Sequence, residues 1–201
     1  MKAIVCEKYG SPEVLHMQNF DKPVPKDNEL LIKVIATTVT AADCRVRGLK
    51  VPSGLELLMR LALGFTGPRQ SILGSELAGY VEAVGKNVTK FRVSDRVLAF
   101  TDIKMGCYAE YKTISENDAV AHIPSSLNFK EAAALSFGGT TALYFLRKAE
   151  LKPGEHILVI GASGSVGTAA VQLAKYFGAE VTAVCSAENA DMVRKLGASQ
   201  L

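Results

Sequence analysis

Short apolar runs, several rich in β-branched residues, alternate with turn residues through the first half of the chain. Closely spaced runs of this kind are typical of a small β-barrel or sandwich. Two segments break the pattern. Residues 40–48 predict a helical turn that Thr40 opens and Gly48 closes. Residues 55–63 are apolar almost all round, which fits either a helix on the core or a wall or lid of an apolar pocket. We expect strands at residues 2–7, 14–19, 29–37, 77–84, 95–100, 107–114 and 119–123.

The hydrophobic period changes near Pro124 from that of strands to that of helices. Asn128 followed by Glu131 resembles a capping box and predicts a helix start. The pattern then predicts helical segments at 132–135 and 141–146 on either side of Gly138–Gly139, a strand at 157–160, a helix at 165–177, a strand at 180–185 and a helix at 188–196. This order opens a parallel, doubly wound sheet. Because such a sheet has about six strands and two are present, we expect a fragment or truncated product.

A glycine-rich turn separates the strand at 157–160 from the helix that follows. Gly161 permits a tight turn, Gly164 lets the backbone approach phosphates, and Gly167 lets the helix pack on the strand. Amide groups at the helix start, together with the helix dipole, favour an anion there. The motif therefore predicts a dinucleotide site; the alternative is a tight structural turn.

Composition excludes several function classes. A net charge of +3 with 48% hydrophobic residues is typical of a globular protein with neither a nucleic-acid nor a membrane partner. No segment reaches transmembrane length, and the first apolar run is too short for a signal peptide. The four cysteines contain no C-x-x-C pair, so we expect a cytoplasmic location without a disulfide framework.

Several blocks in register carry a family resemblance. They are I-L-G-S-E-L-A-G-Y-V-E-A-V-G at 72–85, D-R-V-L-A-F at 95–100, G-C-Y-A-E-Y at 106–111, E-A-A-A-L-S-F-G-G-T-T-A-L at 131–143 and G-A-S-G-S-V-G at 161–167. The chain resembles the zinc-independent medium-chain dehydrogenase/reductases of the quinone oxidoreductase and alkenal reductase group. The resemblance implies an α/β plus β fold: a GroES-like β-barrel catalytic domain at 1–124 and a truncated Rossmann NADP-binding domain at 125–201. The family's usual dimer strand is missing, so the oligomeric state is left open.

The resemblance also implies that no metal is bound. Zinc members carry Cys where this chain has Thr40 and His where it has Ser75, and one carboxylate, Glu76, is not a site. The four-Cys structural loop is absent as well. Without a Lewis acid, hydride transfer to a quinone or an α,β-unsaturated carbonyl is favoured over alcohol dehydrogenation. The alternatives are a non-catalytic nucleotide- or partner-binding protein and a zinc-free reductase of another carbonyl.

The cofactor is expected to be NADPH rather than NADH. The second strand of the parallel pair ends at Ser186, without the carboxylate that binds the ribose of NAD. Asn189 stands where many relatives have Lys, and Glu188 lies close by. By resemblance, the cofactor-binding residues are Thr141, Gly161, Ser163, Gly164, Ser165, Val166, Gly167, Ser186 and Asn189. The alternative for Thr141 is a helix hydroxyl bonded to its own backbone.

Two residues are catalytic candidates by resemblance. Asp43 stands where relatives have the Asp of V-N-P-x-D, and it either lines the nicotinamide pocket or caps the helical turn at 40–48. Tyr108 matches the first Tyr of G-x-Y-A-E-Y. It either contacts a substrate oxygen or is an ordinary strand aromatic. Cys44 and Cys107 have no His or Lys near them in sequence that would support a reactive thiol.

Overall fold

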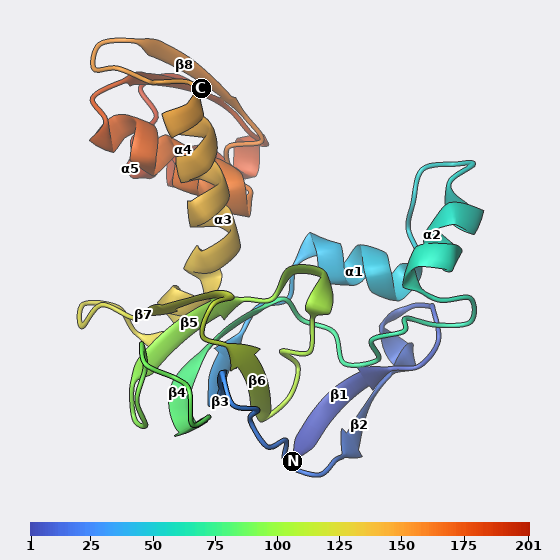
Figure 1. Cartoon of the computed structure of the whole chain (residues 1–201). Coiled ribbons are helices and arrows are strands. Elements are labelled where there is room, and N and C mark those ends of the chain that lie inside the picture. The colour runs from blue at the N-terminus through green and yellow to red at the C-terminus, as the bar shows by residue number, and fades with distance from the viewer. The chain divides into compact units, whose positions relative to one another are not determined.

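The computed structural model describes all residues from Met1 to Leu201. Their strands and α-helices are, in chain order, β1 (Lys2–Cys6), β2 (Leu15–Asn19), β3 (Glu29–Thr37), α1 (Ala41–Gly48), α2 (Glu56–Leu63), β4 (Glu76–Val84), β5 (Arg96–Phe100), β6 (Tyr111–Ser115), β7 (Ala119–His122), α3 (Phe129–Lys148), β8 (His156–Ile160), α4 (Ser165–Tyr176), β9 (Glu180–Val184) and α5 (Ala190–Leu196) (Figure 1). The chain divides into two compact units, Met1–Ala133 and Ala134–Leu201. None of the helices combines the length and apolar character that crossing a membrane requires.

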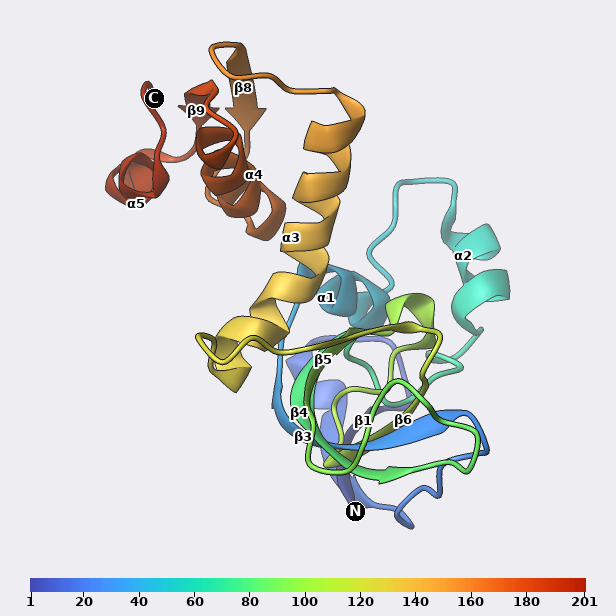
Figure 2. The same cartoon turned by 60° about the vertical axis from the view of Figure 1, so that its left-hand side comes forward.

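The first unit is built on an antiparallel five-stranded sheet in the order β6-β3-β4-β5-β7. Figure 2 labels its central strands β3, β4 and β5. β1 and β2 form a separate antiparallel pair, which joins the segment before β6 through a bridge from Ala3 to Ala109. The edge strands β6 and β7 do not pair with each other, so the expected β-barrel is an open sheet in its hydrogen bonding. Register shifts at Leu31/Ile32 and Val34/Ala36 interrupt the β3–β4 ladder, and irregularities of this kind bend a strand.

β4 lies at the centre of this sheet and is covered on both faces. Leu77 and Val81 pack with Leu30 and Ile32 in one apolar cluster. Ala78, which points to the opposite face, packs in a second cluster around the start of α3. The strand expected at residues 77–84 is confirmed within β4. Consecutive side chains are buried in its first half, because both faces of this central strand are covered.

Helix α1 begins at a reciprocal cap. The Thr40 hydroxyl accepts a hydrogen bond from the backbone N–H of Asp43, and the Asp43 carboxylate accepts one from the backbone N–H of Thr40. Two orphan amide groups of the first turn are thereby satisfied. α2 has no such cap and buries none of its residues. The helix expected at residues 55–63 is confirmed at Glu56–Leu63, but the interpretation that it lies on the core is wrong.

Helix α3 begins at the predicted capping box, which is confirmed in both directions. The backbone N–H of Asn128 donates to Glu131 at 2.9 Å, and the backbone N–H of Glu131 donates to the Asn128 side chain at 3.0 Å. The helix then runs without a break to Lys148, so the expectation of two segments on either side of Gly138–Gly139 is wrong. Glycine lowers helix propensity by about 1 kcal/mol, and the continuous helix tolerates this cost.

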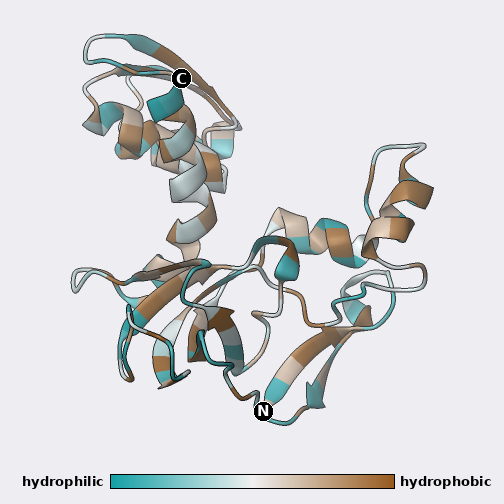
Figure 3. Cartoon of the chain, viewed as in Figure 1, coloured by the Kyte–Doolittle hydropathy of each residue, from teal (hydrophilic) through white to brown (hydrophobic).

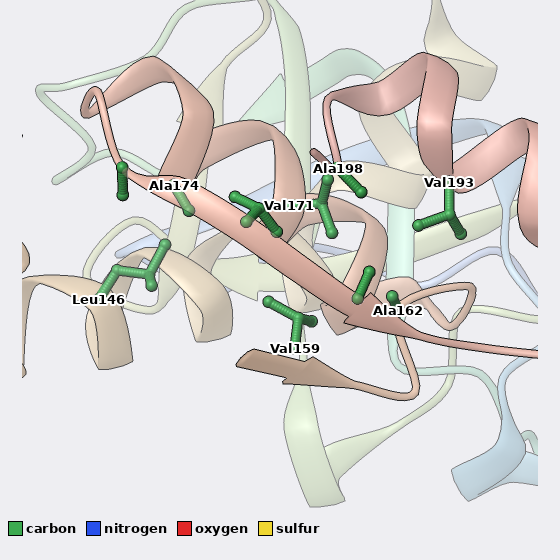
Figure 4. Close-up of a cluster of buried hydrophobic side chains, with 10 residues drawn as sticks. Leu146, Val159, Ala162, Val171, Ala174, Val193 and Ala198 are labelled. Carbon is green, nitrogen blue, oxygen red and sulfur yellow. The ribbon is translucent and has the colours of Figure 1, made fainter. Parts of the chain in front are cut away.

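The second unit is a parallel pair, β8 and β9, joined by α4 and followed by α5. Val159, Val181 and Ala183 point from the strands into a cluster that is closed by residues of α4 and α5 (Figure 4). Leu158 and Ile160 lie on the other face of β8 and are exposed. One face of the predicted β-α-β-α unit thus carries the core of this unit.

The loop at residues 89–90 is held to the end of β6 by one side chain. The buried carboxylate of Glu116 accepts the backbone N–H groups of Thr89 and Lys90, each at 2.9 Å. These two hydrogen bonds, mainly, hold the pKa of Glu116 below its ordinary value. The ionised Glu116 carboxylate therefore stabilises the fold at pH values above the pKa of this group in the unfolded chain, ordinarily about 4.3. This stabilisation is lost as the pH falls through the lower pKa of Glu116 in the folded protein.

We predict that Glu116→Gln lowers the melting temperature at about pH 7, and that the difference from wild type shrinks toward zero below about pH 4, where wild type loses the charge as well. Thermal unfolding across this pH range checks this. Glu150→Gln is the matched control, because Glu150 makes no side-chain hydrogen bond. A difference between Glu116→Gln and wild type that does not change with pH would contradict the role given to the charge.

Candidate functional site

The turn between β8 and α4 has the geometry that an anion site needs. Gly161 has φ +75°, a conformation that favours glycine, and open space surrounds its Cα. The N–H groups of Gly161 and Ala162 both donate to the carbonyl of Val184, at 2.9 and 3.0 Å, so the turn is tied to the end of β9. The N–H of Gly164 donates to the Gly161 carbonyl at 3.0 Å and closes the turn.

Gly167 sets how closely α4 approaches this turn. A Cβ atom at this position would lie 2.2 Å from the Gly161 carbonyl oxygen and 2.7 Å from the Cα of Ala162. At Gly164, by contrast, the nearest atom to such a Cβ is the Gly161 oxygen at 3.4 Å, which is ordinary contact. Gly167 is therefore needed for packing, whereas Gly164 leaves space beside an exposed stretch of backbone.

The first amide groups of α4 are free to bind a ligand. Thr168 is the first residue of the helix whose N–H bonds to the preceding backbone, at 2.8 Å from the Gly164 carbonyl. The N–H groups of Ser165, Val166 and Gly167 have no acceptor in the chain, and Ser165 is exposed. These donors and the positive end of the helix dipole fit a pyrophosphate, as the sequence motif predicts.

A second glycine, which the sequence analysis did not interpret, supports the start of α4. A Cβ on Gly138 of α3 would lie 2.4 Å from the Ser165 hydroxyl and 2.7 Å from the Ser165 carbonyl oxygen. This contact explains Gly138, whereas a Cβ on Gly139 would meet only the Leu135 side chain, at 3.1 Å. The signal was present in the sequence, because a glycine in a helical pattern often has a packing or functional reason.

The end of β9 carries a small polar cluster. The Asn189 side-chain amide donates to the Ser186 hydroxyl oxygen at 2.8 Å, and the Ser186 hydroxyl donates to Glu188 at 3.3 Å. Arg194 pairs with Asp191 at 3.3 Å. The structure thus brings the predicted residues Ser186 and Asn189 into contact, with the Glu188 carboxylate as part of the same cluster.

Thr141 lies on α3 and makes no hydrogen bond within the chain. The neighbouring hydroxyl of Thr140 bonds back to the carbonyl of Ser136 instead, and also to that of Phe137 at 3.3 Å. The structure shows no bond from the Thr141 hydroxyl to its own helix, and the role of Thr141 in cofactor binding stays a prediction. Its hydroxyl is available for another partner.

In the first unit, the buried carboxylate of Asp43 connects two segments. One oxygen accepts from the backbone N–H and the hydroxyl of Thr40, at 2.8 and 2.6 Å. The other accepts from the backbone N–H of Gly74 at 3.2 Å. Both interpretations of Asp43 were left open by the sequence, and the capping role is confirmed. All three bonds are made to protein donors, so the carboxylate holds α1 against the end of the segment that leads to β4.

Tyr108 lies directly beside this connection. Its ring packs on Gly74, where φ is +87° and a Cβ would meet the ring carbon Cδ1 at 2.4 Å. The Tyr108 hydroxyl is buried and makes no hydrogen bond of standard geometry, although it lies close enough to the Asp43 carboxylate to interact with it. Burial and the nearby Asp43 carboxylate raise the pKa of Tyr108, so the phenol stays protonated and can donate. The sequence did not point to Gly74, because its role depends on a residue far along the chain.

The positions at which zinc members carry ligands have other roles here. Thr40 caps α1, and the buried Glu76 accepts a hydrogen bond from the Thr38 hydroxyl. The Ser75 carbonyl accepts from the backbone N–H of Thr101 at 2.7 Å. Burial raises the pKa of Cys107 to about 11, which makes it an inert thiol. No group of three or more His, Cys, Asp or Glu side chains is arranged to hold a metal ion.

Comparison with known proteins identifies the family. A model of the alcohol dehydrogenase GroES-like domain matches residues 26–150. A quinone oxidoreductase of Sus scrofa is 40% identical over 94% of this chain and 54% of that protein. The crystal structure of Escherichia coli quinone oxidoreductase complexed with NADPH matches with a TM-score of 0.84 at 32% identity, over 100% of this chain and 57% of that one. The crystal structure of the CurK enoyl reductase matches with a TM-score of 0.87 at 30% identity, over 99% of this chain and 58% of that one.

The chain therefore belongs to the alcohol dehydrogenase GroES-like family, in the quinone oxidoreductase group of the medium-chain dehydrogenase/reductases. The expected resemblance is confirmed. The chain spans about half the length of the curated relatives it matches.

The contrast between two glycines gives a prediction. Gly167→Ala is expected to destabilise the protein by about 1–3 kcal/mol, because the new methyl group overlaps backbone atoms that cannot move easily. Gly164→Ala is expected to leave the melting temperature nearly unchanged and to weaken NADPH binding roughly tenfold or more, because the methyl group occupies the space a phosphate needs. Thermal unfolding and fluorescence titration with NADPH measure the two effects separately.

Equal destabilisation by the two substitutions would contradict the assignment of Gly167 to packing. Unchanged NADPH affinity in Gly164→Ala would show that the ligand does not approach this backbone.

Proposed function

We propose that this chain is part of an NADPH-dependent oxidoreductase and that residues 125–201 are the opening portion of a Rossmann dinucleotide-binding domain. The observation that carries the proposal is the start of α4. The N–H groups of Ser165, Val166 and Gly167 have no acceptor there, and an added Cβ on the preceding Gly164 would make only ordinary contact. The NADPH-complexed relative from Escherichia coli supports the choice of cofactor. The proposed division between the catalytic and the cofactor domain lies after residue 124.

The cofactor-binding residues follow from this geometry. The amides of Ser163, Ser165, Val166 and Gly167 hold the pyrophosphate at the dipole end of α4. When bound, NADPH supplies the hydride. At the end of β9, Ser186 and Asn189 accommodate a ribose phosphate as hydrogen-bond donors, and the phosphate takes the Ser186 hydroxyl from Glu188, to which it now donates. Thr141 offers its hydroxyl near the nicotinamide.

Asp43 and Tyr108 have different roles in this proposal. The Asp43 carboxylate is occupied by backbone and hydroxyl donors, so it positions α1 and the Gly74 segment. The Tyr108 hydroxyl makes no hydrogen bond of standard geometry in the chain, so it donates a hydrogen bond to the substrate oxygen. A donor of this kind stabilises the negative charge that develops on a carbonyl or quinone oxygen during reduction.

The substrate is proposed to be a quinone or an α,β-unsaturated carbonyl, and the reaction to be zinc-independent. The names of the related quinone oxidoreductases and of the CurK enoyl reductase support the two substrate classes. The absence of cysteine and histidine at Thr40 and Ser75 supports the zinc-free reaction. The rate of such a reaction then depends more on how the substrate and the cofactor are positioned than on acid–base catalysis.

NADPH oxidation at 340 nm with a simple quinone tests this proposal, with an alkenal and a simple aldehyde as comparison substrates. Turnover with the quinone or the alkenal is expected. Nucleotide binding without turnover of any acceptor would instead indicate a nucleotide-binding protein. Turnover restricted to the aldehyde would contradict the proposed substrate class, and activity that disappears on dialysis against a zinc chelator would contradict the zinc-free reaction.

Tyr108→Phe is predicted to separate function from stability. Because a buried hydroxyl without a hydrogen bond of standard geometry is unfavourable, its removal should raise the free energy of unfolding by up to about 1 kcal/mol. Because the substrate loses a hydrogen-bond donor, kcat/KM should fall roughly 10- to 100-fold. Urea unfolding and steady-state kinetics measure these quantities. A variant that is both less stable and unchanged in kinetics would overturn the role proposed for the hydroxyl.

Ser186→Asp is predicted to change the cofactor preference. A carboxylate at the end of β9 repels the 2′-phosphate of NADPH and accepts the ribose hydroxyls of NADH. NADPH affinity should fall by about 100-fold, whereas NADH affinity should rise or stay constant. Fluorescence titration with both nucleotides is the measurement, and Ser199→Asp, a hydroxyl outside the proposed site, is the control. Equal losses for the two nucleotides would place the ribose elsewhere.

A further inference from the structure

Helix α2 and the turn after it form an exposed apolar stripe, which we call the α2 patch. It consists of Leu57, Leu58, Leu61 and Phe65, with exposed fractions of 66%, 60%, 51% and 56%. Their spacing puts them along one side of the helix axis. Figure 3 shows that α2 is predominantly hydrophobic along its length. Contiguous exposed apolar side chains of this size mark an interaction surface more often than they occur by chance.

Polar anchors at one end hold this helix in place. The Tyr9 hydroxyl donates to the carbonyl of Gly64 at 2.7 Å, and Arg69 donates to the carbonyl of Leu61 at 2.8 Å. Arg60 donates to a carbonyl of the following turn and lies over the Tyr9 ring. An isolated helix this short is not stable in water. The anchors therefore replace apolar packing, and they leave the leucines free.

The α2 patch lies in the most basic part of the chain. Residues 45–70 contain one acidic and five basic side chains, although the whole chain has a net charge of only +3. These charged residues are Arg45, Arg47, Lys50, Glu56, Arg60 and Arg69. An exposed apolar stripe within a segment rich in basic residues complements a lipid bilayer, whose interior is apolar and whose headgroups can be anionic.

We propose that the α2 patch docks on a lipid bilayer that carries anionic headgroups. The leucines and Phe65 enter the boundary between headgroups and acyl chains, and the exposed cations of Arg45 and Lys50 contact the headgroups. This differs from the expectation of no membrane partner, which was based on the chain's overall charge rather than on its local distribution. It also goes beyond the proposed function, although the two fit together because apolar quinones dissolve in lipid.

Co-sedimentation with vesicles tests the proposal. Wild type should bind vesicles of phosphatidylcholine with phosphatidylserine and bind pure phosphatidylcholine weakly. The triple variant Leu57→Gln/Leu58→Gln/Leu61→Gln should lose at least about 100-fold in partition coefficient. Lys50→Gln should lose about fivefold. Both changes are at exposed side chains, so the melting temperature should stay unchanged.

The control is Val24→Gln/Ile103→Gln/Tyr176→Gln, which makes three changes at side chains that are 84%, 82% and 83% exposed outside the α2 patch. It should bind vesicles like wild type. No binding to anionic vesicles by wild type would overturn the proposal. So would self-association without lipid that the α2 triple variant abolishes, because the patch would then be an interface between copies. Vesicle binding does not require turnover, so either result is independent of the proposed oxidoreductase activity.

Discussion

Among the glycines of the second unit, Gly167 is the one at which an added Cβ would lie nearest to another atom, the Gly161 carbonyl oxygen, and the proposed cofactor site depends on this close packing. Without a side chain at Gly167, α4 packs directly on the turn that follows β8, and Gly138 of α3 lets the first residue of α4 come equally close. This packing fixes the direction of the helix start. The amide groups of its first turn consequently face outward with no acceptor, which is the condition for binding an anion.

An analogous constraint operates in the first unit around a single carboxylate. Asp43 accepts three hydrogen bonds from two segments, and it is buried because those bonds satisfy it. The Gly74 segment held in this way provides the surface on which the Tyr108 ring lies. The one polar group in this arrangement that is left without a hydrogen bond of standard geometry is the Tyr108 hydroxyl. An unsatisfied buried group in an otherwise well-bonded region is typical of a functional position.

The α2 patch follows a different principle. Core helices are held by their apolar faces, but α2 is held by hydrogen bonds at its C-terminal end. Tyr9 and Arg69 donate to the carbonyl groups of Gly64 and Leu61, and Arg60 donates to that of Phe65 in the following turn. Cationic donors suit this end of a helix, because its carbonyls are unsatisfied and carry the negative end of the dipole. The apolar residues therefore contribute little to the fold, and their exposure needs an explanation outside the unit.

The sequence by itself determined the order of the elements, the cap at Asn128 and the glycine turn at 161–167. Each of these is a local property: a periodicity, a spacing of three residues, or a strand followed directly by glycines and a helix. The tertiary structure alone decided that α3 continues through Gly138, that Asp43 bonds to Gly74, and that α2 buries nothing. These features depend on residues distant in sequence, whose contacts leave no periodic trace along the chain. The family resemblance supplied the identity of candidate residues, whereas only the packing shows which of their polar atoms are already satisfied and which are free to act.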